Sequence, residues 1–251
     1  MTIEIDSVIA QMLREYAERY ETEDFIVGDP SWWMHQVSGV DNQEVVAFVA
    51  SVLSYGSRQQ FMPKIQTLLE WCGGEMDQWL RDGDFRKRFS SDDKRCFYRL
   101  YNYGCMYRFF EVYSRMLNQY GSMGAYLRSR VGGGFDAVEA ICRYFSENGV
   151  SVVVPKDTTS ACKRVCMFLR WMVRDSSPVD LGLWAGFIDR RTLIMPLDTH
   201  VVSQSVRLGL LRSTSASMSA ARRLTEAMSS VFPDDPLRGD FALFGYGVNN
   251  K

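Results

Sequence analysis

The stretch VVAFVASVL, residues Val45–Leu53, is apolar on nearly every side when it is wound as an α-helix. A helix of that kind has no face for water, so the stretch predicts a central buried helix around which other elements pack. Asp41 and Glu44 stand three residues apart just before it. That is the spacing of a capping box, in which side chains satisfy the free amides of a helix N-terminus. The sequence therefore predicts a helix that opens at Asp41.

Helical periodicity continues on both sides of this segment. Apolar residues recur at helical spacing over 5–20, 61–71, 135–145, 158–174, 199–208, 217–231 and 236–244. One or two further helices are expected over 96–120, and Ser151–Val154 is the one plausible strand. We therefore predict an all-α protein.

Composition narrows the function classes. The chain has 251 residues and a formal net charge of −1, so no global basic field draws it to nucleic acid. No apolar run is long enough to span a bilayer, and the N-terminal residues do not resemble a signal peptide. The six cysteines are scattered without a C-x-x-C pair, which favours reduced thiols and a cytoplasmic location.

Asp198 lies in the segment IMPLDTHV, residues Ile194–Val201, directly after an apolar run and directly before a helical one. A carboxylate at that position caps a helix, and the helix dipole favours its charge. A fixed anion can also orient a nucleophile or stabilise a developing cation. A plain N-cap and a catalytic carboxylate are both compatible with this pattern.

The helix expected over 158–174 carries a cationic stripe. Lys163, Met167, Arg170 and Arg174 follow one another at spacings of four, three and four residues, without interleaved acidic partners. We expect this stripe to be exposed, and a solvated polar face is the simpler interpretation of it. A lysine near a helix N-terminus feels an unfavourable dipole, which favours the neutral amine that a nucleophile requires.

These segments resemble a known superfamily. Asp198-Thr199-His200-Val201 with Arg207-Leu208-Gly209 resembles the catalytic-aspartate segment of the helix-hairpin-helix DNA glycosylases. Lys163 precedes Asp198 by 35 residues, a separation similar to that in archaeal 8-oxoguanine glycosylases. Val45–Leu53 with the loop Ser54–Ser57 resembles the superfamily's early helix and a DNA-contacting loop. The whole chain resembles a bacterial family of unassigned function (DUF2400-like).

The resemblance implies a fold, an activity and a set of site residues. It implies two helical subdomains flanking a cleft, 41–191 with a degenerate helix-hairpin-helix, and 1–40 together with 192–251. The implied activity is DNA base excision with β-lyase chemistry, acting on 8-oxoguanine. Lys163 would be the nucleophile and Asp198 its electrostatic partner. The expected DNA contacts are Ser57, Arg164, Arg170, Arg174, His200 and Arg207, and the expected base pocket is Trp171, Asp240 and Phe244.

The chain also departs from the superfamily. Pro155–Cys162 replaces the glycine-containing hairpin that approaches a phosphate. No cysteine follows Cys166, so the ligands of the superfamily's iron–sulfur cluster are missing. We expect no metal and no cofactor, no membrane partner, and a monomer that acts on damaged duplex or single-stranded DNA. The alternative is a non-catalytic protein of the same fold that binds nucleic acid or a modified nucleoside, with His200 as an ordinary helix-surface residue.

Overall fold

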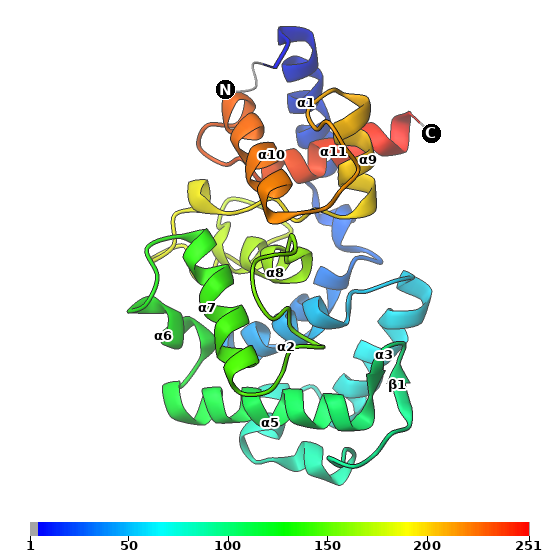
Figure 1. Ribbon diagram of the computed structural model, residues 1–251, viewed down its shortest axis with the longest axis vertical. Coiled ribbons are helices and arrows are strands. Elements are labelled where there is room, and N and C mark those ends of the chain that lie inside the picture. Colours follow the sequence, from blue (N-terminus) through cyan, green and yellow to red (C-terminus); the bar gives the residue numbers. More distant parts are fainter. Residues whose placement is uncertain (1–4, 251) are drawn as a thin grey trace. The chain divides into compact units, whose positions relative to one another are not determined.

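The computed structural model describes residues 5–250, and its regular elements are almost entirely helical (Figure 1). The α-helices are α1 (Ser7–Tyr20), α2 (Val40–Leu53), α3 (Arg58–Trp71), α4 (Met76–Arg81), α5 (Tyr103–Tyr120), α6 (Met123–Arg128), α7 (Gly134–Glu147), α8 (Lys163–Val173), α9 (Thr199–Arg207), α10 (Met218–Val231) and α11 (Arg238–Asn249). Short 3-10 turns cover Glu23–Ile26, Pro30–His35, Asp84–Lys87 and Arg190–Thr192. The strands β1 (Cys96–Tyr98) and β2 (Tyr101–Asn102) pair antiparallel. The predicted all-α class is confirmed.

The chain forms two compact units. Within the described residues, the first unit contains the chain up to Val27, Gly132–Val138 and everything from Thr158 onward. The second contains Gly28–Val131 and Glu139–Asp157, so helix α7 contributes to both. The subdomain boundaries expected from the sequence, 41–191 against 1–40 with 192–251, stay a prediction.

Helix α2 forms the core of the second unit, as its apolar sequence predicts. Its residues from Glu44 to Leu53 are all buried. The Phe48 ring lies 5.9 Å from that of Phe109 and 5.2 Å from that of Tyr113, both on α5, and 5.4 Å from that of Phe145 on α7. Aromatic contacts at these separations add to the free energy gained by burial.

The predicted capping box is wrong. Helix α2 begins at Val40, so Asp41 and Glu44 both lie inside it. The carboxylate of Glu44 instead accepts hydrogen bonds from the amides of Met123 at 2.7 Å and Gly124 at 3.1 Å. These amides open α6, so a buried side chain of one helix satisfies the N-terminus of another. The local spacing of Asp41 and Glu44 carries no information about that distant partner.

Three further expectations are corrected. The segment expected to be helical from residue 96 begins with the β1–β2 hairpin, whose turn places Arg99 at φ 50°, and α5 starts only after Asn102 caps it. Ser151–Val154 forms no strand, because Val153 and Val154 are buried in succession without a neighbouring strand. Helix α8 begins at Lys163 rather than Thr158, because Cys162 takes a left-handed conformation (φ 47°, ψ 36°).

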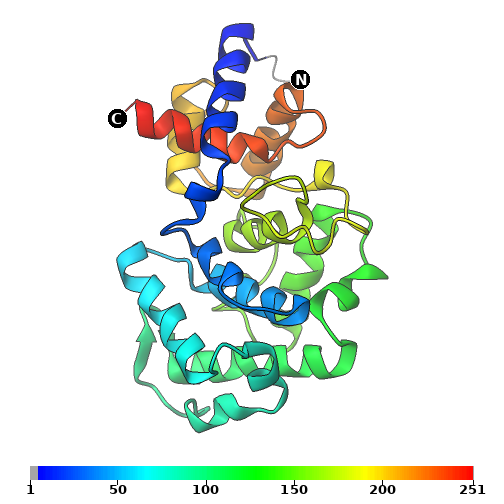
Figure 2. The same ribbon diagram turned by 180° about the vertical axis from the view of Figure 1, so that it is seen from behind.

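The first unit is organised around α1 and α11, which cross and pack against each other (Figures 1 and 2). A side chain at Gly245 would collide with the Tyr20 ring, so glycine permits this close approach. Phe25, just after α1, lies 4.9 Å from Phe241 and 5.0 Å from Phe244, measured between ring centroids. Helix α9 packs on α11 as well.

Within the described part of the chain, none of the helices has the length and apolar character that a membrane crossing requires.

Replacing Glu44 by alanine should lower the free energy of unfolding by about 2 kcal/mol, because two buried amides lose their acceptor. Denaturant titration of Glu44→Ala measures this loss. The matched control is Asp41→Asn, which alters an exposed carboxylate of the same helix and should change stability by less than about 0.5 kcal/mol. A larger loss of stability for Asp41→Asn than for Glu44→Ala would contradict the role of Glu44 as the acceptor for the amides that open α6.

Candidate functional site

Asp198 is the N-cap of α9, as the sequence predicts. Its Oδ1 accepts a hydrogen bond from the amide of Val201 at 2.7 Å. The run Leu193–Leu197 before it is buried, which fixes where the carboxylate stands. The side chain is half-buried and its second oxygen is not used by the cap. Asp198 is therefore positioned as a structural cap and as a fixed anion at once.

Lys163 is the first residue of α8 and is half-buried. Among residues 5–250 its ammonium group has neither a hydrogen bond nor an ion pair. No side chain caps this helix end, so the amine stands against the positive end of the helix dipole without a bonded carboxylate.

Asp240 on α11 connects these two groups. Burial raises the pKa of its carboxyl to about 6, with the charge of Asp198 acting in the same direction and the charges of Arg170 and Lys163 opposing it. Asp198 and Lys163 thus lie close enough to act electrostatically on one carboxyl group. Its Oδ2 accepts a hydrogen bond from Nη1 of Arg170. The structure therefore brings together three predicted site residues from α8, α9 and α11, all within the first unit.

The expected exposed cationic stripe is wrong at Arg170 and Arg174. Their relative exposures are 3% and 0%. Arg170 pairs with Asp180 and Asp240 and lies over the Phe241 ring, with 4.7 Å from Cζ to the ring centroid. An arginine in this setting has no free face for a DNA phosphate, so neither guanidinium enters our proposal as a DNA contact.

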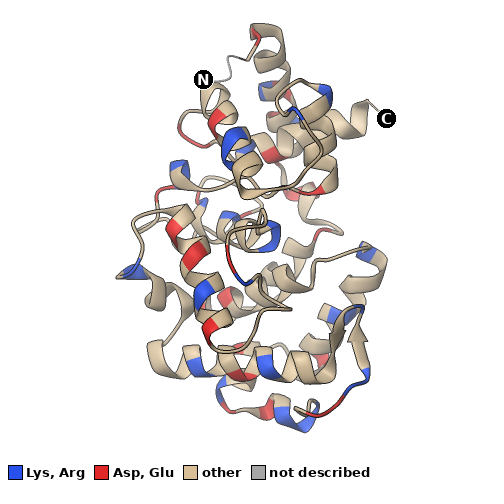
Figure 3. Cartoon of the chain, viewed as in Figure 1, with Lys and Arg blue, Asp and Glu red and all other residues tan. Residues whose placement is uncertain are grey.

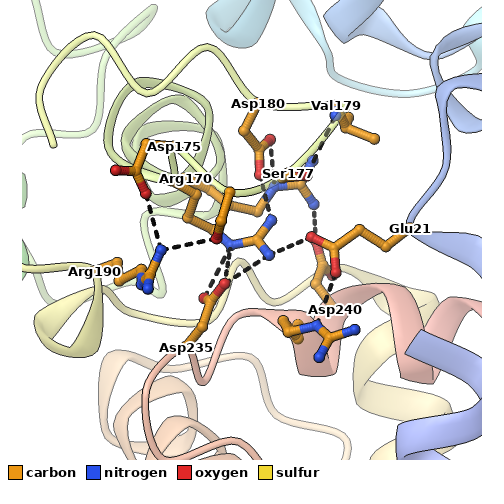
Figure 4. Close-up of polar contacts among 12 residues, drawn as sticks. Glu21, Arg170, Asp175, Ser177, Val179, Asp180, Arg190, Asp235 and Asp240 are labelled. Carbon is orange, nitrogen blue, oxygen red and sulfur yellow. Dashed lines mark hydrogen bonds and ion pairs between the residues drawn. The ribbon is translucent and has the colours of Figure 1, made fainter. Parts of the chain in front are cut away.

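Arg174 forms a buried ion network with Glu21, Asp180 and Asp235, the carboxylates labelled in Figure 4. It donates to Asp235 with 2.9 Å and 3.0 Å from Nε and 2.8 Å from Nη2, and it also pairs with Asp180 and Glu21. Burial alone would raise the pKa of Glu21, but the neighbouring Arg174 outweighs burial and lowers that pKa. At Asp180, burial outweighs both arginines and raises the pKa of the carboxyl.

The sequence did not identify the three carboxylates of this network. Glu21 follows the last residue of α1, Asp180 follows α8, and Asp235 precedes α11. The sequence contained one indication, since α8 itself carries no acidic partners. If its arginines are buried, the carboxylates that pair with them must come from other segments.

The other expected DNA contacts lie in different settings. Ser57 is exposed at the N-cap of α3 in the second unit, and His200 is exposed in the first turn of α9. Arg164 is half-buried. Arg207 is exposed and donates to the carbonyl oxygen of Asn250 at 2.7 Å. Their roles toward DNA stay predictions.

The remaining base-pocket residues also differ from each other. Trp171 is fully buried, and its Nε1 has no hydrogen-bond partner among the described residues. Phe244 is 36% exposed and stands one turn after Asp240 on α11. Phe244 can therefore present part of its ring to a ligand, whereas Trp171 is a core residue.

Neither the cavities nor the distribution of charged residues indicates a second candidate site. Two cavities of about 630 and 530 Å³ open near the C-terminal end of α8, where Val173, Arg174 and Asp175 contribute to their walls. Lys163 stands at the other end of this helix, roughly 16 Å away along its axis. Cationic and anionic residues are distributed over both units (Figure 3). No group of three or more His, Cys, Asp or Glu residues in the described chain is arranged to hold a metal ion.

Comparison with known proteins gives a family match. A family model described as a protein of unknown function (DUF2400) matches residues 29–249. No curated protein and no solved structure matches the chain significantly.

Replacing Arg174 by methionine should cost about 3–5 kcal/mol of unfolding free energy, because three carboxylates lose their buried counter-charge. Chemical denaturation of Arg174→Met at neutral pH measures this. Arg191→Met is the control, since Arg191 pairs with Asp189 at the surface and its side chain is 62% exposed. Equal stability of the two variants would show that the network contributes no more than a surface pair.

Proposed function

The chain belongs to the DUF2400 family, and we propose that it is a DNA glycosylase with lyase activity that removes a damaged base. The observation that carries this proposal is that Lys163 and Asp198, which stand at the starts of α8 and α9, both act electrostatically on the carboxyl group of Asp240. An amine without a bonded partner beside a fixed anion is the arrangement that imine chemistry at a sugar requires.

The proposed reaction begins with a nucleotide turned out of the helical stack into the site. The neutral amine of Lys163 attacks C1′ of the sugar, and the bond from C1′ to the base breaks. Positive charge develops on the sugar as this bond lengthens, and the carboxylate of Asp198 stabilises it. The amine adduct then opens the sugar ring and becomes an imine, from which β-elimination cleaves the strand.

The setting of each group supports this assignment. Lys163 and Asp198 each begin a helix, so backbone packing rather than a flexible loop fixes them. The partly exposed ring of Phe244 offers an apolar surface on the helix that carries Asp240. An oxidised purine such as 8-oxoguanine is the substrate class that the sequence resemblance implies, and it is proposed on that basis.

A non-catalytic binding protein is the second candidate. Two observations favour it: residues 155–162 contain no glycine for close approach to a phosphate, and Arg170 and Arg174 are buried away from solvent. A binding protein has no need of a half-buried lysine without a bonded partner. Covalent trapping therefore separates the two candidates.

Sodium borohydride should reduce a covalent adduct between wild-type protein and an oligonucleotide that contains an abasic site or 8-oxoguanine. Lys163→Gln should form none, because the amide cannot make an imine. Lys156→Gln, which removes an exposed lysine nearby in sequence, is the control and should trap like wild type. Trapping by Lys163→Gln at the wild-type rate would remove Lys163 from the mechanism.

Asp198→Asn should separate catalysis from folding. Asparagine caps a helix about as well as aspartate, so stability should change by less than about 1 kcal/mol. The neutral amide cannot stabilise a cationic sugar, and single-turnover excision should slow at least about 100-fold. The cap control is Asp6→Asn, whose carboxylate accepts from the Val8 amide at the start of α1. Excision at an unchanged rate by Asp198→Asn would leave Asp198 as a cap alone.

A further inference from the structure

We propose that Asp240 donates the proton that the departing base requires, a role that rests on the proposed glycosylase function and deepens it. Lys163 and Asp198 supply a nucleophile and an anion, but neither supplies an acid for the leaving group. Expulsion of an unprotonated purine is slow, so a positioned acid at the site adds to the rate.

The geometry places Asp240 on the lysine's side of α8. Lys163 and Arg170 are seven residues apart on α8, so they share one face of the helix. Helical side chains lean toward the helix N-terminus, so the Arg170 guanidinium extends toward Lys163. Nη1 of Arg170 donates a hydrogen bond to Oδ2 of Asp240, so this bond does not use Oδ1. The Asp240 side chain is 16% exposed, so it is largely enclosed yet retains access.

Burial favours retention of a proton by Asp240, in opposition to the cationic groups that face it. Arg170 and Lys163 on α8 are cationic, and Asp198 at the start of α9 is anionic. Arg170 also binds Asp180 through Nε at 3.3 Å, so its charge is shared between two carboxylates. On α11 itself, Arg238 donates to Glu21 at 2.9 Å. Burial therefore prevails at Asp240, and its pKa rises to about 6.

Asp198 is less suited to this task. Its Oδ1 already accepts the Val201 amide at the N-terminus of α9. The two carboxylates thus differ in environment, one enclosed and one at a helix end. Such pairs divide acid and anion roles in other enzymes.

The proposed step conserves both protons and electrons. The neutral amine of Lys163 forms the N–C1′ bond while the C1′–base bond breaks, and its electron pair goes to the base. The base takes the proton of the Asp240 carboxylic acid and leaves neutral. The cationic secondary amine gives up one proton to water, and water protonates the ring oxygen of the sugar as the ring opens to the protonated imine. Hydrolysis or elimination releases the lysine, and Asp240 takes up a proton from solvent for the next turnover.

The test compares the pH dependence of single-turnover excision of 8-oxoguanine by wild type and by Asp240→Asn. Above about pH 6 the wild-type rate should be level, because loss of the Asp240 proton offsets the gain in neutral amine. Asp240→Asn should be about 100-fold slower at pH 7, and its rate should rise steadily with pH because only the lysine still titrates. Asp240→Glu should recover part of the level region.

A preformed abasic site provides the internal control, because no base has to leave. Borohydride trapping at that site should be within about threefold for wild type and Asp240→Asn. Asp180→Asn is the matched variant, since it also removes a carboxylate from Arg170, and its excision profile should stay level above pH 6. Carbon-13 NMR of the carboxyl groups, with Asp240→Asn for assignment, should show Asp240 titrating near pH 6.

The other outcomes distinguish a failure of the acid role of Asp240 from a failure of the proposed glycosylase function. A level excision profile for Asp240→Asn, or an Asp240 carboxyl that titrates below about pH 4.5, would overturn the acid role and leave the glycosylase intact. Loss of abasic trapping in Asp240→Asn would show a structural role in place of an acid. Absence of any wild-type adduct on either oligonucleotide would overturn the proposed function and the acid role with it.

Discussion

The first unit depends on the burial of one guanidinium group, that of Arg174. An arginine stays charged, and moving that charge out of water costs several kcal/mol unless carboxylates surround it. Glu21, Asp180 and Asp235 provide those carboxylates from the end of α1, the segment after α8 and the turn before α11. The same three carboxylates would repel one another without Arg174. The guanidinium group of Arg174 therefore holds together segments that lie far apart in sequence, because separating any of their carboxylates from it would leave a buried charge unpaired.

Helix α8 consequently has two different ends. Its C-terminal end, with Arg170 and Arg174, is buried and fully paired, and it fixes the helix in the unit. Its N-terminal end carries Lys163 after a residue in a left-handed conformation, with no bonded partner in the described chain. The ion network thus fixes the C-terminal end of the helix whose first residue is Lys163.

The sequence predicted what is local and missed what is distant. The all-α class, the buried helix α2 and the cap at Asp198 all follow from residues within one or two turns of each other. The Met123 amide that binds Glu44 lies 79 residues away, and the spacing of Asp41 and Glu44 does not indicate it. The expectation of an exposed stripe is wrong for the same reason. The sequence of one helix gives its own charges but not the carboxylates that other segments contribute. The strand expected at Ser151–Val154 does not form, because the two strands of the described residues, β1 and β2, pair with each other and not with this segment.

The choice between an enzyme and a binding protein rests on which charges the fold leaves without bonded partners. Most buried charges of the first unit have a hydrogen-bonded counter-charge, since an unpaired one is costly. Lys163, Asp198 and Asp240 are set apart from this pattern: the lysine is unbonded, one aspartate uses one oxygen for a cap, and the other has a raised pKa despite its arginine. Groups with perturbed or uncompensated charge concentrate at functional sites, because chemistry needs protons that can move. These three residues lie on or at the start of α8, α9 and α11, all within one unit, so the proposed proton transfer from Asp240 to the base would depend on the fold of that unit alone.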